Sequence, residues 1–316
     1  MELSPLAGVG VRSALALALL AAGPLPATGQ SVHVLIATGL AGEPRYAATF
    51  HAAAAALYDL AHGAWGVPDS SLVLLTEDPA ADAARIRGRS TREGVGQALV
   101  ALSRRVRPGD VLLVLLIGHG SGQGADSRVS LPGPDATAAD FRGWLAGFER
   151  QTVVFVNAAS ASGDFLETLA APGRVVVTAT RSALERNETV FAEHFVRGLA
   201  GAADGDKDGR VSALEAFEYG KRETARAYES GNRLLTEHAQ LGDSALAAGV
   251  TFGGTRTVDP RAAELVAERR ALEERVAELR GRKGTMDSTA YERELERLLL
   301  EIAEKTRAIR AMGERP

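Results

Sequence analysis

The chain has 316 residues, of which 46% are hydrophobic and 24% charged, and its formal net charge is −4. This composition is typical of a globular protein, and the slight acidity gives no general attraction for nucleic acid or anionic lipid, so we expect no nucleic-acid partner. The chain contains no cysteine, which excludes disulfides, thiolate metal sites and any thiol nucleophile.

Residues 1–29 have the pattern of a secretory signal peptide. Arg12 precedes an apolar run from Ala14 to Ala22, and small or turn-forming residues continue to Gly29, as a cleavage region requires. A membrane anchor is the alternative, but the run is about half the roughly 20 residues needed to span a bilayer. No later segment is apolar and long enough to cross a membrane. We therefore expect a soluble protein that is secreted or periplasmic.

Residues 30–255 alternate apolar, strand-like runs with helix-like stretches. Residues 111–117 are apolar at every position, which is typical of a central parallel strand buried on both faces. The alternation predicts an α/β fold, an open and mostly parallel sheet flanked by helices, with functional residues at the carboxyl ends of its strands. The predicted strands are residues 31–37, 71–76, 111–117, 152–156 and 174–180, and the predicted helices are residues 47–62, 92–106, 138–148, 165–170, 190–199 and 213–228.

Three successive predicted strands end in loops of small residues. His119, between two glycines, directly follows the most apolar strand, although a lone histidine is more often structural than catalytic. Residues 157–163 follow the next strand and include Ser160; such a turn suits either an oxyanion hole or a tight packing corner. Residues 178–182 form the third loop.

The order and spacing of these loops resemble the catalytic core of the legumain- and caspase-type cysteine peptidases. In that family a histidine in the first loop and a cysteine in the second form the catalytic dyad. The family's Ala-Cys-x-Ser-Gly pattern aligns with residues 159–163, so the resemblance puts Ser160 at the cysteine position, opposite His119. It implies a caspase-like fold for residues 30–255. Segments that resemble bacterial members, some of which replace the cysteine turn, are residues 131–135, 178–181 and 201–204.

The serine at position 160 leaves three interpretations open. A serine hydroxyl is a poor nucleophile without a well-oriented base, which favours a non-catalytic homologue that keeps a cleft for a peptide or protein partner. An active serine-type hydrolase or endopeptidase would use Ser160 and His119, with Asp126 or Glu185 as the orienting acid. The third interpretation is that the chain is another kind of α/β protein, whose small-residue turns resemble those of the peptidases by coincidence. Arg181 and Glu185 are expected to form a surface ion pair rather than to bind a charged ligand.

Residues 204–215 match a complete twelve-residue EF-hand loop. Oxygen ligands at these intervals suit a hard cation, and we expect Ca²⁺ in a stabilising role. The alternative is an acidic, solvated loop whose serine and final glutamate form a capping box for the next helix. The expected ligands are Asp204, Asp206 and Asp208 at positions 1, 3 and 5, the Arg210 carbonyl at 7, Ser212 at 9 and Glu215 at 12, with Gly209 making the turn at 6.

Residues 259–313 change to a composition rich in Ala, Leu, Glu and Arg. Leucines recur every seven residues from Leu265, and residues 281–284 interrupt this pattern. Thr289 with Glu292 forms a capping box at the start of a second predicted helix. The pattern predicts a helical hairpin that either packs on the domain surface or forms a homodimeric coiled coil. A structural envelope protein assembled through these helices is therefore a further possible function.

Overall fold

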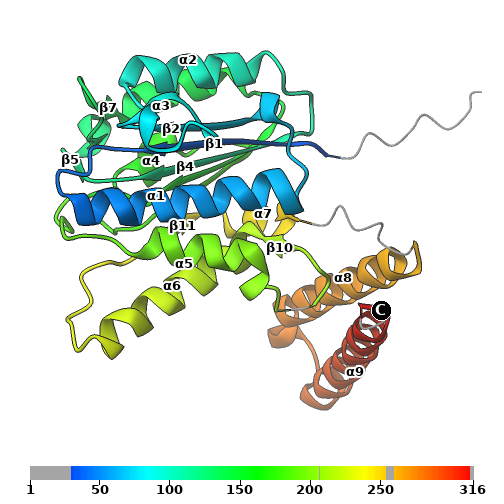
Figure 1. Cartoon of the computed structure of the whole chain (residues 1–316). Coiled ribbons are helices and arrows are strands. Elements are labelled where there is room, and N and C mark those ends of the chain that lie inside the picture. The colour runs from blue at the N-terminus through cyan, green and yellow to red at the C-terminus, as the bar shows by residue number, and fades with distance from the viewer. Residues whose placement is uncertain (1–29, 206, 254–259, 314–316) are drawn as a thin grey trace, which may run out of the picture.

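The computed structural model describes residues 30–205, 207–253 and 260–313, so the predicted signal peptide lies outside the described residues. A seven-stranded sheet runs through the centre in the order β11-β9-β8-β4-β1-β2-β3 (Figure 1). Every neighbouring pair is parallel except β11 with β9, which confirms the predicted α/β fold with a mostly parallel sheet. The strands are β1 (Val32–Thr38), β2 (Leu72–Thr76), β3 (Ile86–Arg89), β4 (Val111–Ile117), β8 (Thr152–Asn157), β9 (Arg174–Thr178) and β11 (Gln240–Gly242).

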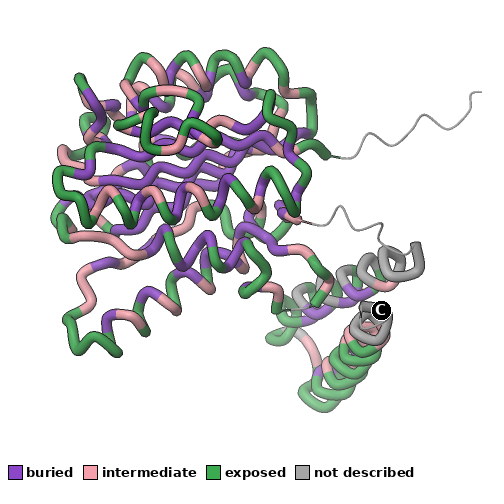
Figure 2. Tube along the Cα trace, viewed as in Figure 1, coloured by how far each residue is buried: buried purple, intermediate pink, exposed green. Residues whose placement is uncertain are grey.

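The central strand β4 is buried along its whole length because it pairs with β1 on one side and β8 on the other. Its side chains alternate between two apolar cores, as the two-residue period of a strand requires. Leu113 and Leu115 pack into one core, and Leu112 and Val114 into the other. Figure 2 shows the buried strands enclosed between more exposed helical layers.

Helices cover both faces of the sheet. The face that carries Leu113 is covered by α1, α5, α6 and α7, which contribute Phe50 and Phe195 among others. The opposite face is covered by α2, α3 and α4, which contribute Phe141 and Phe165. The bounds are α1 (Pro44–Asp59), α2 (Arg92–Ser103), α3 (Ala138–Trp144), α4 (Phe165–Leu169), α5 (Phe191–Arg197), α6 (Ala213–Ser230) and α7 (Ser244–Gly249).

Several short elements were not predicted because they are too short or too polar to give a hydrophobic period. The edge strands β3 and β11 are of this kind, since β3 alone contains two arginines. The other short strands are β5 (Gly120–Ser121), β6 (Arg128–Val129), β7 (Ala136–Thr137), β10 (Val211–Ser212) and β12 (Thr251–Phe252). The short helical turns are η1 (Leu60–Ala64), η2 (Asp69–Ser71), η3 (Pro79–Asp82), η4 (Gly124–Asp126), η5 (Leu145–Gly147) and η6 (Gly198–Ala202).

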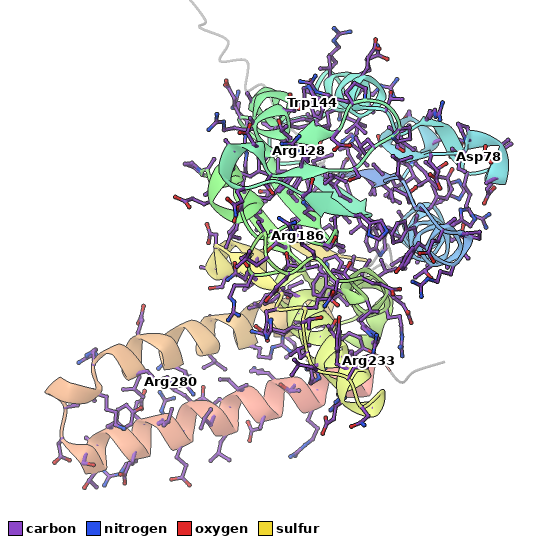
Figure 3. All side chains as sticks on the ribbon, turned by 90° about the vertical axis from the view of Figure 1, so that its left-hand side faces the viewer. Asp78, Arg128, Trp144, Arg186, Arg233 and Arg280 are labelled. Atoms are coloured by element: carbon purple, nitrogen blue, oxygen red, sulfur yellow. The ribbon has the colours of Figure 1, made fainter. Side chains whose placement is uncertain are left out.

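The C-terminal segment forms a helical hairpin of α8 (Pro260–Gly281) and α9 (Ser288–Gly313), joined through η7 (Lys283–Thr285) (Figure 3). Its own apolar cluster includes Leu272 and Leu298, while Leu299 and Leu300 on the outer side are exposed. The predicted capping box at Thr289 is wrong, because Asp287 accepts the Ala290 N–H at 3.0 Å and α9 already begins at Ser288. None of the described helices combines the length and apolarity needed to cross a bilayer.

Candidate functional site at the carboxyl edge of the sheet

The predicted catalytic residues lie on neighbouring loops at the carboxyl edge of the sheet. His119 follows β4 and Ser160 follows β8, and these two strands pair directly, with Leu116 opposite Asn157. The chain runs from β1 outward to β3 and then returns to β4 on the other side of β1. His119 therefore lies at the point where the strand order reverses, which is where open α/β sheets usually bind ligands.

The two loops touch through the backbone of Gly120. Its N–H donates a hydrogen bond to Ser160 Oγ over 3.2 Å. A Cβ atom at position 120 would lie 2.4 Å from the Ser160 carbonyl oxygen and 2.9 Å from that of Arg128. Only glycine therefore allows this approach. The contact leaves Ser160 2% exposed, so its hydroxyl is buried beneath the loop that carries His119.

The imidazole of His119 packs against aromatic side chains of α1. Its ring centroid lies 4.9 Å from that of Tyr46 and 5.4 Å from that of Phe50, both edge-on. Within the described residues, no hydrogen bond joins the imidazole to Ser160, whose partner is the Gly120 N–H. A general base must be within hydrogen-bond reach of the proton that it removes, and among the described residues His119 and Ser160 are not joined in this way.

The turn after β8 uses most of its backbone N–H groups internally. Those of Ser162 and Gly163 both donate to Thr180 Oγ1, at 2.7 and 3.2 Å. The Ala159 N–H donates to a side-chain oxygen of Asn157, and the Ala161 N–H to the Glu185 carbonyl. An oxyanion hole needs donors that point at a ligand. The donors of Ala161, Ser162 and Gly163 instead tie the turn to the loop after β9.

Neither acid expected to orient His119 contacts it in the described part of the chain. Asp126 is exposed in η4. Glu185 instead accepts a 2.6 Å hydrogen bond from His238 Nδ1 and a second one from the His238 backbone N–H at 3.1 Å. Its Oε1 also lies 3.7 Å from a nitrogen of the exposed Arg181 guanidinium, the predicted ion pair.

Glu237 is a buried carboxylate that sequence reasoning missed. It is 2% exposed and accepts 2.9 Å hydrogen bonds from the N–H groups of Val190 and Phe191, at the start of α5. Burial raises the pKa of Glu237 to about 7, against the opposing effect of those two N–H donors. No local pattern signals this role, because the capped helix lies more than forty residues earlier in the chain.

The predicted EF-hand loop joins η6 to α6. Gly209 has a φ of 80° and Lys207 a φ of 61°, so the chain turns sharply at position 6, as an EF-hand loop does. The Gly209 N–H donates to Asp204 Oδ2 at 3.1 Å, and the Arg210 N–H donates to Asp208 Oδ1 at 2.8 Å. Two of the predicted ligands therefore face the interior of the loop.

The end of the loop forms the capping box of α6. Ser212 Oγ accepts the Glu215 N–H, and Glu215 Oε2 accepts from the Ser212 N–H at 2.8 Å. The other carboxylate oxygen, Oε1, would lie 3.9 Å from a Cβ atom at Gly205 and so faces the loop. Asp206 lies outside the described residues, and within them no group of three acidic or histidine side chains is gathered closely enough to hold a metal ion.

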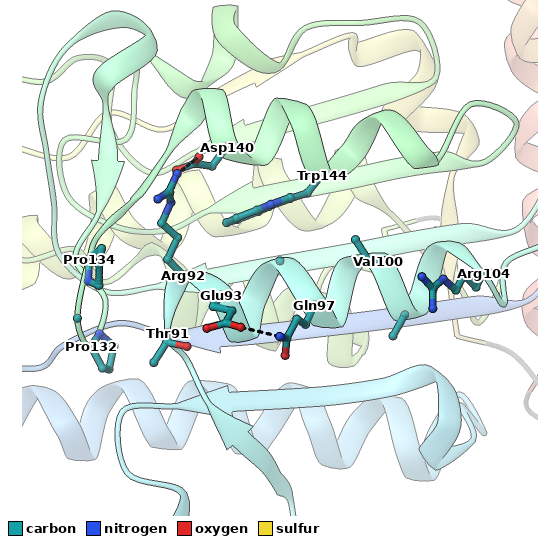
Figure 4. Close-up of a pocket in the computed structure, with 13 residues that line it drawn as sticks. Thr91, Arg92, Glu93, Gln97, Val100, Arg104, Pro132, Pro134, Asp140 and Trp144 are labelled. Atoms are coloured by element: carbon teal, nitrogen blue, oxygen red, sulfur yellow. Dashed lines mark hydrogen bonds and ion pairs between the residues drawn. The ribbon is translucent and has the colours of Figure 1, made fainter.

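Two cavities lie elsewhere on the domain. One of about 190 Å³ lies at the carboxyl ends of β1 and β2, between Phe50, His51 and Glu77. A larger cavity of about 840 Å³ lies beside α2 and α3, where Trp144 packs against Gly96 (Figure 4). At its side the Arg92 guanidinium forms a bidentate ion pair with Asp140, which lowers the pKa of Asp140 to about 2.

Comparison with known proteins identifies no family. No family model matches the chain, and no curated protein matches it. Among solved structures, the crystal structure of protein GSU0716 from Geobacter sulfurreducens is similar, with 12% sequence identity and a TM-score of 0.43. The match covers 72% of this chain and 96% of the other.

Replacing Gly120 with alanine is expected to destabilise the domain, since the new methyl group meets two carbonyl oxygens of the backbone. We expect a loss of about 1–3 kcal/mol in the free energy of unfolding, measured by urea denaturation. Gly143→Ala is the matched control, because nothing lies within 4 Å of that position in α3. Equal stabilities for the two variants would show that the loops do not approach as described.

Glu237 is expected to make stability fall as the pH rises. An acid whose pKa is raised from 4.5 to about 7 binds more protons in the folded than in the unfolded state between those values. The stabilising contribution of Glu237 to the free energy of unfolding is therefore complete below about pH 4.5 and is lost by about pH 7. The change is on the order of 3 kcal/mol. Urea denaturation across this range should give a flatter profile for Glu237→Gln. Parallel profiles for the two proteins would contradict this assignment.

Proposed function

We propose that this chain is an exported, non-catalytic homologue of the legumain- and caspase-type peptidases that binds a peptide or protein segment at the carboxyl edge of its sheet. One observation carries the proposal. Ser160, at the position of the nucleophile, is buried and its hydroxyl is held by the Gly120 N–H rather than by His119.

The arrangement of the edge explains why hydrolysis is disfavoured. A serine nucleophile needs a base that takes its proton and a third group that orients the base. The His119 ring instead contacts Tyr46 and Phe50, and the carboxylate of Glu185 is occupied by His238. An extended ligand would therefore be held along this edge without being cleaved.

Exposed side chains on either side of the edge support a binding role. Leu40, in the loop after β1, is 39% exposed, and Leu184, in the loop after β9, is 78% exposed. Arg181, three residues before Leu184 in the same loop, has an exposed guanidinium. Apolar side chains combined with a polar group are the usual means of holding a peptide.

We also propose that the loop of residues 204–215 binds Ca²⁺ and stabilises the packing of α6. The positive φ angles of Lys207 and Gly209, and the inward carboxylates of Asp204 and Asp208, support this role. The loop is also joined to the rest of the domain, because Val211 pairs with Phe252 in the β10–β12 ladder. Ordering the loop would therefore strengthen that junction.

The absence of hydrolysis is tested with a fluorophosphonate probe and a fluorogenic peptide library. We expect no covalent labelling at position 160 and no cleavage by the wild-type protein, with or without Ca²⁺, because the hydroxyl is buried and has no base. Ser160→Ala is the matched control for labelling elsewhere. Labelling that disappears in both Ser160→Ala and His119→Ala would establish a serine hydrolase instead.

Calcium binding is tested by thermal unfolding with Ca²⁺ or with a chelator. A ligand present at a hundredfold excess over its Kd stabilises the folded state by about 2.7 kcal/mol, so we expect a rise of several degrees in Tm. Asp204→Asn should remove the rise, whereas Asp126→Asn, an exposed acid outside the loop, should keep it. An unchanged Tm at millimolar Ca²⁺ would leave residues 204–215 as a helix-capping loop.

A further inference from the structure

A polar cavity lies at the opposite edge of the sheet, beside the amino ends of β1 and β4. Its volume is about 800 Å³, within the usual range for small-molecule sites. Three arginines line it: Arg105 and Arg107, from the segment before β4, and Arg210, from the loop of residues 204–215. Trp65, which stacks on Phe252 with ring centroids 5.2 Å apart, lies in its wall.

A buried hydrogen-bonded pair, His33 and Asp110, lies in the wall of this cavity. His33 Nε2 lies 3.3 Å from Asp110 Oδ2, and the two residues are 5% and 6% exposed. The Asp110 carboxylate also accepts from the N–H groups of Ser31 and Arg107, at 3.1 and 2.7 Å. The Asp110 carboxylate is thus already hydrogen-bonded by donors of the protein.

The arginines keep donors for a ligand. Arg105 uses one nitrogen of its guanidinium on the Ser70 carbonyl, which leaves its other N–H groups available. In the part of the chain that the structure describes, the buried Nε of Arg210 and the buried Nδ1 of His33 have no hydrogen-bond partner. A guanidinium carries only N–H donors and no acceptor, so the arginines of this wall call for acceptor oxygens such as those of an anion.

The charge of the wall indicates the class of that occupant. Three guanidinium groups and one carboxylate give a formal charge of 3 − 1 = +2, with His33 counted as neutral. A ligand with a single carboxylate would offset half of this charge of +2, whereas a ligand with a phosphate dianion would offset all of it. Guanidinium groups also bind phosphate oxygens in pairs of parallel hydrogen bonds.

We propose that this cavity is a binding site for a small molecule that carries a phosphate group, with Arg107 and Arg210 as its principal ligands. The site is separate from the carboxyl edge because it lies at the other ends of the same strands. Its existence does not depend on the proposed peptide or calcium binding.

The proposal is tested by calorimetric titration with inorganic phosphate and, in a second arm, with phenyl phosphate, in the presence of a chelator. Sodium chloride at the same ionic strength is the reference. We expect saturable binding that Arg107→Gln and Arg210→Gln each weaken roughly tenfold or more. Arg104→Gln, a neighbouring exposed arginine that does not line this cavity, should bind as the wild type does. Tighter binding of phenyl phosphate would identify an ester as the ligand, and equal binding would identify free phosphate.

Fluorescence of Trp65 gives an independent readout. The chain has two tryptophans, and Trp144 lines the cavity between α2 and α3. In Trp144→Phe the remaining emission reports on Trp65 alone, so phosphate should change it with the same midpoint as the calorimetry. No saturable binding, the same response to chloride, or equal affinities for Arg104→Gln and Arg107→Gln would overturn the proposal.

Discussion

The contact between Gly120 and Ser160 determines the character of the whole carboxyl edge. It brings the loop after β4 so close to the loop after β8 that a Cβ atom at position 120 would lie 2.4 Å from a carbonyl oxygen. The same contact satisfies Ser160 Oγ through the Gly120 N–H and removes the side chain from solvent. A site built in this way is rigid, and its potential nucleophile is occupied by the protein itself.

The neighbouring loops extend this rigidity along the edge. Thr180 Oγ1 holds two N–H groups of the turn after β8, and Glu185 connects that turn to His238. Glu237, the next residue, caps α5 from the same segment. The loops that follow β4, β8 and β9 and the segment that precedes β11 therefore hold each other. A preformed edge of this kind lowers the entropic cost of ordering loops when a ligand binds, as the proposed peptide-binding role requires.

The sequence predicts those features of the fold that depend on local pattern. Residues 111–117 are apolar throughout and form the buried central strand, and the loops that carry His119 and Ser160 lie side by side because parallel strands end at one edge. Contacts between distant residues could not be predicted. The pairing of Glu185 with His238 spans 53 residues, and nothing near either residue indicates it. The start of α9 was missed because Asp287 and Thr289 are both good capping residues, and only the backbone distinguishes them.

The burial of position 160 can be measured directly with Ser160→Cys. The natural chain has no cysteine, so the introduced thiol is the sole target for iodoacetamide. We predict that the folded protein is alkylated far more slowly than the same protein in denaturant, because the side chain at this position is buried beneath the Gly120 loop. Alkylation of the folded protein at the rate of an exposed thiol would contradict the account, since it would place position 160 in an open and reactive site.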